Sequence, residues 1–176
     1  MVKIIYNKTI KELGNQISSY NETVPAGGTT AALNGYLAVS LFKLVFKASK
    51  NNLSKNDLEK IQINLNESEV QFLSLMNKDI EAYKLNNQLN FHNKKKLKKL
   101  IEIPLDIAET AFKIFQLTKK FENKIKNTVL ADYKVALENI KSSKKGAVAI
   151  IKSNYQFFEK DSSFIKEIEK KLSCLE

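Results

Sequence analysis

Two glycines in front of an apolar segment form the first group of residues that could do chemistry. Gly27 and Gly28 would let a ligand approach the backbone closely, and Thr29 follows where a helix is expected to begin. The first N–H groups of a helix have no partner within it and lie at its positive end, so this turn can receive an anion. No strand precedes the turn and no Gly-Lys-Thr follows it, which excludes a Rossmann fingerprint and a Walker A loop. The structural alternative is a glycine turn with a threonine cap.

Asp79 and Tyr83 are the second candidate group. They are four residues apart, so on a helix both side chains project from the same face. A carboxyl group beside a phenol can pass a proton or hold a polar ring, and the apolar residues before Asp79 can raise its pKa by desolvation. A solvated carboxylate on an amphipathic helix is the simpler interpretation of the same spacing.

Three further residues have side chains that could take part in chemistry, but the residues around them give little support for such a role. Asp132 is expected early in a helix, where a carboxylate interacts favourably with the helix dipole. His92 stands alone beside a run of lysines, and no cluster of metal-ligating residues has the required spacing, so we expect no metal site. Cys174 has no base near it in the sequence, so we do not expect a nucleophile there.

The elements that must position these residues are helices. The chain has only five Gly and two Pro among 176 residues, which favours long helices over a sheet with many turns. The segment from Thr29 or Thr30 to about Lys50 is apolar almost all round, which is typical of a central, buried helix. The pattern predicts an all-α, multi-helix bundle of six or seven helices, with residues 1–176 forming one domain. Individual boundaries are expected at Thr9, Ser54, Asp161 or Ser162, and Pro104, the last in the first turn of its helix.

The charge of the chain indicates an anionic partner without naming one. The formal net charge is +10, and the sequence has no Arg, so all 29 basic residues are Lys. The run at 94–99 could attract an anion, although an AT-rich genome explains much of the lysine content equally well. Lys is a point charge and does not read guanine or phosphate with two hydrogen bonds, so we do not expect a nucleic-acid partner.

The apolar segments do not indicate a membrane protein. The N-terminus has no apolar region of a signal peptide. The longest apolar stretch, residues 31–46, is interrupted by Asn34, Ser40 and Lys43, and it is shorter than the roughly 20 residues of a membrane span. We therefore expect a soluble, cytoplasmic protein without a membrane partner.

Taken in order, these segments resemble the cyclodeaminase/cyclohydrolase family. This family comprises the C-terminal domain of formiminotransferase-cyclodeaminase and the methenyltetrahydrofolate cyclohydrolases related to it. The resemblance extends over roughly residues 9–158. It is carried by Gly27-Gly28-Thr29 with Gly35, by Asp79, Ala82 and Tyr83, by Ile103-Pro104-Leu105, by Asp132, Val135 and Ala136, and by Gly146, Ala147 and Asn154.

The resemblance implies an all-helical homodimer that binds tetrahydrofolate near the subunit interface. It also implies chemistry on the one-carbon group of a tetrahydrofolate derivative, without a metal or redox cofactor. One reaction hydrates 5,10-methenyltetrahydrofolate to the 10-formyl form, and the other closes 5-formiminotetrahydrofolate to the methenyl form with release of ammonia. We expect the cyclohydrolase reaction before the cyclodeaminase reaction, because no formiminotransferase domain is present in these 176 residues.

The same resemblance suggests a role for each candidate residue. Asp79 and Asp132 are the expected catalytic residues, with proton transfer assigned to Asp79. Asp132 would, together with Asn154, orient the pterin or a water molecule. The remaining substrate-binding residues, expected to shape the folate pocket, are Gly27, Gly28, Thr29 and Tyr83.

Three departures from the family pattern leave an alternative open. Ala26 replaces a glycine, Ala131 replaces a serine, and Ile150 replaces an asparagine, so two polar side chains of the pattern are missing. These changes favour a second hypothesis, a catalytically inactive helical homodimer that binds folate or a protein partner. A third and weaker hypothesis is a nucleic-acid binder driven by the lysines, which predicts salt-dependent retention on DNA.

Overall fold

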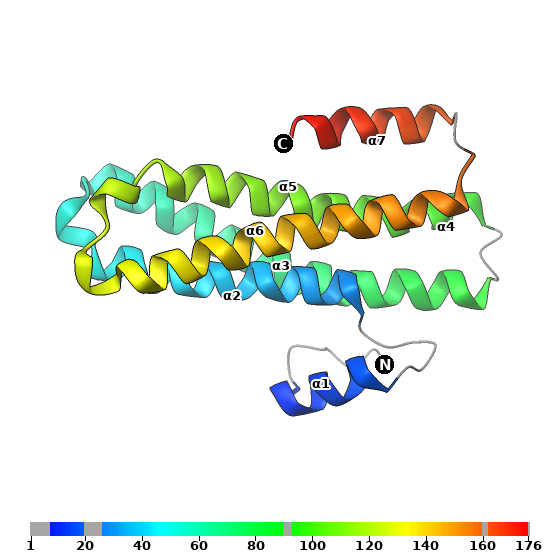
Figure 1. Cartoon of the computed structure of the whole chain (residues 1–176), viewed down its shortest axis with the longest axis horizontal. Coiled ribbons are helices and arrows are strands. Elements are labelled where there is room, and N and C mark those ends of the chain that lie inside the picture. The colour runs from blue at the N-terminus through cyan, green and yellow to red at the C-terminus, as the bar shows by residue number, and fades with distance from the viewer. Residues whose placement is uncertain (1–7, 20–25, 90–92, 160–161, 176) are drawn as a thin grey trace.

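The computed structural model describes residues 8–19, 26–89, 93–159 and 162–175. Every regular element in these residues is helical, which confirms the predicted all-α fold (Figure 1). The α-helices are α1 (Ile10–Ser18), α2 (Gly27–Ala48), α3 (Lys55–Gln88), α4 (Lys94–Leu97), α5 (Lys99–Lys119), α6 (Leu130–Asn154) and α7 (Ser163–Ser173), and short 3₁₀ turns lie at Lys50–Asn52, Glu122–Lys124, Asn127–Val129 and Tyr155–Phe157.

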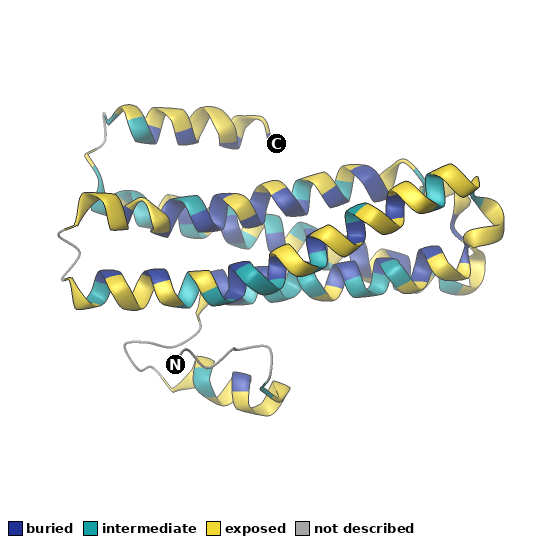
Figure 2. Cartoon of the chain, turned by 180° about the vertical axis from the view of Figure 1, so that it is seen from behind, coloured by how far each residue is buried: buried dark blue, intermediate teal, exposed yellow. Residues whose placement is uncertain are grey.

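Helices α2, α3, α5 and α6 run side by side as a bundle, and α2 contacts the other three. The side of α2 that faces the other helices is buried (Figure 2). Ala32, Phe42 and Phe46 on this side are at most 1% exposed. Full burial of a phenylalanine side chain stabilises a fold by about 1.5–3 kcal/mol. The prediction of a buried central helix is therefore confirmed.

Small residues set the spacing of α2 against α6 and α3. A Cβ atom on Gly146 of α6 would lie 3.4 Å from Cβ of Ala31, so these two helices approach closely there. On the other side, a Cβ atom on Gly35 would lie 2.4 Å from the ring of Phe72 in α3. Gly35 is therefore required for the phenylalanine ring to lie against the backbone of α2.

The contacts between α2 and α6 fix an antiparallel register. Ile150 of α6 lies against Gly27 at the start of α2. Near the other end, the rings of Phe42 and Tyr133 are in edge contact, with 5.9 Å between their centroids. The last turns of α6 therefore lie beside the first turn of α2, and the first turn of α6 lies beside the later part of α2.

Side-chain caps begin three helices where the sequence predicts them. Thr9 and Glu12 form a reciprocal capping box at α1. Ser54 caps α3 by accepting the N–H of Asp57, and Ser162 caps α7 by accepting the N–H of Ile165. Such a cap stabilises a helix by about 1 kcal/mol. Asp161, the alternative cap for the last helix, lies outside the described residues.

The prediction that Pro104 lies in the first turn of its helix was wrong. Helix α5 already begins at Lys99, and Pro104 lies inside it. The part of the lysine run before it is also helical, as the short α4, which Asn93 caps by accepting the N–H of Lys96. Proline has no N–H to bond to the carbonyl four residues earlier, so the Leu100 carbonyl needs another donor.

Among the described residues, α2 is the one helix whose length and composition would allow it to cross a membrane. Half of its most apolar window is buried inside the bundle. This is weak support for a membrane span, because the core helix of a bundle passes the same test.

Candidate functional site

The first turn of α2 holds the carboxyl group of Asp79. The hydroxyl of Thr29 donates a hydrogen bond of 2.9 Å to Oδ2 of Asp79, which lies in the C-terminal third of α3, fifty residues later in the chain. Thr29 is 1% exposed and Asp79 is half-buried, so the hydrogen bond is partly shielded from solvent. The structure therefore brings together the two segments in which the sequence analysis placed Asp79 and Thr29.

Gly28 makes room for this carboxyl group. A Cβ atom on Gly28 would lie 2.1 Å from Oδ1 of Asp79, closer than side chains tolerate. The requirement for glycine is thus a matter of space beside the Asp79 carboxyl group. An alanine at position 28 would displace either the carboxyl group or the first turn of α2.

Burial raises the pKa of Asp79 above its usual value of 3.8. Hydrogen bonds from the side chain and the backbone of Thr29 act in the opposite direction, because they stabilise the ionised form, but they do not cancel the effect of burial. A carboxyl group with a raised pKa can accept a proton and return it nearer to neutral pH than an exposed aspartate can.

An apolar side chain contacts the glycine turn. The Cδ1 atom of Ile150 lies 3.1 Å from the position that a Cβ atom on Gly27 would occupy. This is the position where the resemblance expects an asparagine. The start of α2 therefore contacts hydrocarbon on the α6 side, while Gly27 itself stays exposed.

Tyr83 lies one turn beyond Asp79 on α3, at the edge of the bundle. Its side chain is 46% exposed, whereas the Asp79 carboxyl group lies against α2. The structure therefore places Tyr83 near the candidate site along α3, and its predicted contact with a substrate stays a prediction.

Asp132 lies near the opposite end of the bundle. It is in the first turn of α6 and is the neighbour of Tyr133, which contacts Phe42 of α2. Phe42 and Thr29 are thirteen residues apart on α2, which corresponds to about 20 Å along the helix. Within one chain, the structure does not bring Asp132 together with Asp79.

Asn154 has a structural partner. Its side-chain amide donates a hydrogen bond of 2.7 Å to the carbonyl oxygen of Leu100 in α5. This is the carbonyl that Pro104 leaves without a helical N–H donor. The predicted contact of Asn154 with a substrate stays a prediction, and the described contact joins the end of α6 to α5.

A cleft of about 680 Å³ between α3, α5 and α7 is a feature that sequence reasoning missed. Its lining includes Lys98 and Lys99 from the lysine run, together with Asp106 and Phe164, and carries charges of both signs. Burial raises the pKa of Asp106. No local sequence signal marks this cleft, because its walls come from helices far apart in the chain.

Metal ligands are not grouped in the described parts of the chain. No three or more His, Cys, Asp or Glu side chains lie together there in a way that could hold an ion. His92 lies outside the described residues, and the expectation that the site uses no metal stays a prediction.

Comparison with known proteins gives two findings. The sequence model of the formiminotransferase-cyclodeaminase family matches residues 9–173. The crystal structure of formiminotetrahydrofolate cyclodeaminase from Thermotoga maritima matches with a TM-score of 0.86 and 17% sequence identity, over 97% of this chain and 89% of that chain. At this identity the likeness shows a shared fold. No curated protein has a significant sequence match. Because the family model matches nearly the whole chain, the chain belongs to the formiminotransferase-cyclodeaminase family.

Proposed function

We propose that the protein is a folate one-carbon enzyme in which Asp79 transfers protons at the one-carbon group. The observation that carries this proposal is the half-buried Asp79 carboxyl group, which Thr29 holds at the start of α2 and whose pKa is raised by desolvation. Membership of the formiminotransferase-cyclodeaminase family supports a tetrahydrofolate derivative as the substrate. We further propose that the protein acts as a cytoplasmic homodimer.

The first candidate reaction is the hydration of 5,10-methenyltetrahydrofolate. The ionised Asp79 carboxylate accepts a proton from water while the water oxygen bonds to the cationic methenyl carbon. The protonated carboxyl group then donates this proton to N5 as the bond between N5 and the carbon breaks. The hydroxyl proton leaves to solvent, and 10-formyltetrahydrofolate is released. A raised pKa suits Asp79 for both halves of this cycle, because the same group must accept and return a proton.

The second candidate reaction is the cyclisation of 5-formiminotetrahydrofolate, and the likeness to the cyclodeaminase from Thermotoga maritima favours it. The formimino group reacts in its protonated, cationic form. N10 attacks its carbon, so that the protonated imino nitrogen becomes an amino group. Asp79 takes the proton from N10 and passes it to this amino group as the bond between nitrogen and carbon breaks. Ammonia then leaves, and the methenyl cation remains. The same residue serves both reactions, because both pass through an adduct at the one-carbon atom.

One assay distinguishes the two reactions. Absorbance of the methenyl form is lost in the hydration and gained in the cyclisation, so both can be followed against the spontaneous rate. We expect the Asp79→Asn variant to lose about 10²- to 10⁴-fold in rate. Glu81→Gln is the matched control, because Glu81 lies on the same helix but faces the cleft beside α5. This control should keep the wild-type rate.

Three results would overturn the proposal in different ways. If the wild type accelerates neither reaction, the protein is not an enzyme for these substrates. If Asp79→Asn keeps full activity, the proton-transfer role is wrong. Calorimetry that shows folate binding without turnover would instead support the inactive folate-binding dimer that Ala131 and Ile150 suggest.

A further inference from the structure

Two neighbouring glycines at the start of α2 each receive a side chain from a different helix. A Cβ atom on Gly28 would overlap Oδ1 of Asp79 in α3. A Cβ atom on Gly27 would lie 3.1 Å from Cδ1 of Ile150 in α6. Successive residues of a helix point about 100° apart, so the two contacts are on different sides of the first turn. This turn is therefore contacted on two sides, by Asp79 and by Ile150.

The first turn of α2 has no side-chain cap of its own. Ala26 precedes it and has no side chain that can accept a hydrogen bond. The N–H of Thr29 has no acceptor within the helix at this position, and the Asp79 carboxylate accepts it together with the Thr29 hydroxyl. The turn and the carboxyl group therefore fix each other, and a support for the turn is also a support for Asp79.

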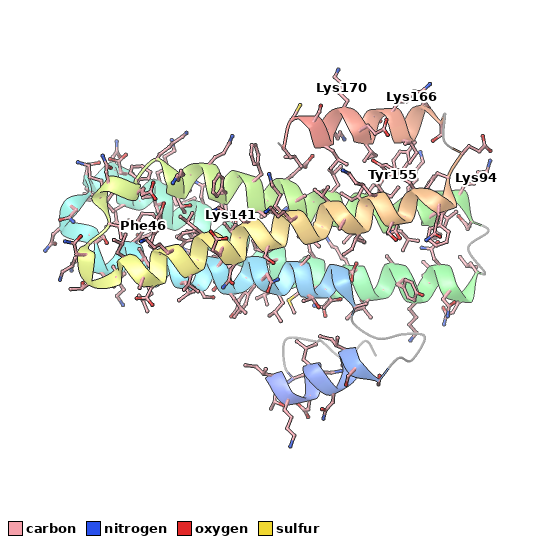
Figure 3. All side chains as sticks on the ribbon, viewed as in Figure 1. Phe46, Lys94, Lys141, Tyr155, Lys166 and Lys170 are labelled. Atoms are coloured by element: carbon pink, nitrogen blue, oxygen red, sulfur yellow. The ribbon has the colours of Figure 1, made fainter. Side chains whose placement is uncertain are left out.

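Ile150 can be such a support because the end of α6 is itself fixed. Asn154, one turn after Ile150, donates its hydrogen bond of 2.7 Å to the Leu100 carbonyl oxygen of α5. Tyr155, the next residue, lies at the end of α6 on the side of α7 (Figure 3). Burial raises the pKa of Tyr155, and the charge of Glu169 in α7 adds to this effect. The last turn of α6 is therefore held by α5 and covered by α7, and a side chain on it can hold the start of α2 by contact.

The contact between Ile150 and Gly27 lies at the edge of the core. Ile150 is only half-buried and Gly27 is exposed, whereas Ala147 and Ile151 of the same helix are 0% exposed. Removing the end of the Ile150 side chain should therefore cost the bundle little, while the contact with Gly27 is lost. An effect on the Asp79 site can thus be distinguished from a loss of fold.

We propose that Ile150 is a positioning residue for Asp79, because its side chain holds the first turn of α2 where Thr29 can donate to the carboxyl group. This proposal rests on the proposed function. Asp79 remains the group that exchanges the proton, and Ile150 acts on it only through the backbone that begins at Gly27. The isoleucine, which departs from the family pattern, thus supports catalysis in this chain.

Shortening the side chain tests the proposal in the kinetics. Ile150→Ala removes Cδ1 and should lower kcat about 10- to 100-fold, the effect of a small displacement at a reacting group, while KM stays within about threefold. Ile150→Leu keeps a δ-methyl group and should restore most of kcat. Val148→Ala is the matched control on the same helix. Val148 is also half-buried, and it points about 200° away from Gly146, which faces α2, so this variant should keep both kinetic constants.

Hydrogen exchange tests the same contact without any enzyme activity. The N–H of Thr29 bonds to Asp79 and to no carbonyl of its own helix, so its exchange rate measured by NMR reports on the contact between the turn and the carboxyl group. Ile150→Ala should accelerate this exchange by about tenfold or more, and Val148→Ala should leave it unchanged. The N–H of Phe42, in the buried part of α2, should exchange as in the wild type in both variants, which shows that the bundle is intact.

The outcomes separate this inference from the proposed function. If Ile150→Ala keeps the wild-type kcat, or lowers it without changing the exchange of Thr29, the positioning role is overturned and the folate function stands. A rise in KM alone would also overturn it, because Ile150 would then contact the substrate. If the wild type turns over neither folate, but Ile150→Ala still accelerates the exchange of Thr29, the function fails and the catalytic part of the inference fails with it, while the support of the turn by Ile150 is confirmed.

Discussion

The side-chain amide of Asn154 donates its hydrogen bond to the carbonyl oxygen of Leu100, at 2.7 Å. This carbonyl is four residues before Pro104, which has no N–H to offer it. Asn154 therefore supplies the donor that the proline removes. Since Asn154 is the last residue of α6, the same hydrogen bond fixes the end of α6 to the first turn of α5.

We predict that Asn154→Ala lowers the free energy of unfolding by about 1–3 kcal/mol, because it leaves a carbonyl without its donor. This loss of unfolding free energy should be smaller in a Pro104→Ala background, because residue 104 then has an N–H for the Leu100 carbonyl. Chemical denaturation of the four proteins in this double-mutant cycle measures the coupling. If Asn154→Ala lowers the free energy of unfolding equally in both backgrounds, Asn154 does not replace the N–H that Pro104 lacks. A raised KM with unchanged stability would instead favour the substrate-binding role predicted for Asn154.

We predict that Thr29→Val moves the acid limb of kcat/KM to higher pH. The hydrogen bonds from Thr29 lower the pKa of Asp79, so removing the hydroxyl lets its pKa rise further. The ionised carboxylate is the form that accepts the proton, and it would then form only at higher pH. Thr29→Ser keeps the hydroxyl and should leave the limb near its wild-type position. If the Thr29→Val and Thr29→Ser variants have the same pH–rate profile, the Thr29 hydroxyl does not control the pKa of Asp79.

We predict that the stability of Asp79→Asn relative to the wild type increases as the pH rises from about 4 toward neutral. The folded pKa of Asp79 is raised above 3.8, so in this range the folded state binds more protons than the unfolded state. Stability is therefore lost as the pH increases through the folded pKa, and the uncharged amide of the variant does not have this loss. The difference in Tm between variant and wild type should be smallest near pH 4 and should grow as the pH rises. For a chain of this size, 1 kcal/mol corresponds to about 2–4 °C. A difference that shrinks with rising pH would contradict burial of the carboxylate.

The sequence predicted the helices well, because caps and apolar periodicity are local properties. Ser54 and Thr9 begin their helices where the spacing indicates. Pro104 misled the prediction, because proline favours the first helical turn on average but is tolerated later when another group bonds the free carbonyl. That group is Asn154, fifty residues away, and nothing in the local sequence reveals it.

The candidate site was predictable only in part, for the same reason. The residue types near Gly28 and Asp79 indicated a polar site, but their contact joins α2 to α3 across fifty residues. No local pattern indicates that Asp132 and Asp79 lie toward opposite ends of α2, since the antiparallel packing of α2 and α6 decides their separation. The cleft beside Asp106 escaped prediction because three separate helices form it.

We predict that Gly28→Ala reduces kcat strongly while the helical fold is kept. The new methyl group would lie 2.1 Å from Oδ1 of Asp79, so the carboxyl group must move by about 1 Å or rotate away from Thr29. A displacement of this size at a reacting group can cost about 10²-fold in rate. Gly14→Ala is the matched control, because Gly14 is also helical and a Cβ atom there meets nothing within 4 Å. Circular dichroism should show both variants folded, and only Gly28→Ala should lose turnover. If Gly28→Ala keeps the wild-type rate, the Asp79 carboxyl group does not need its position beside α2, and its role in proton transfer would have to be abandoned.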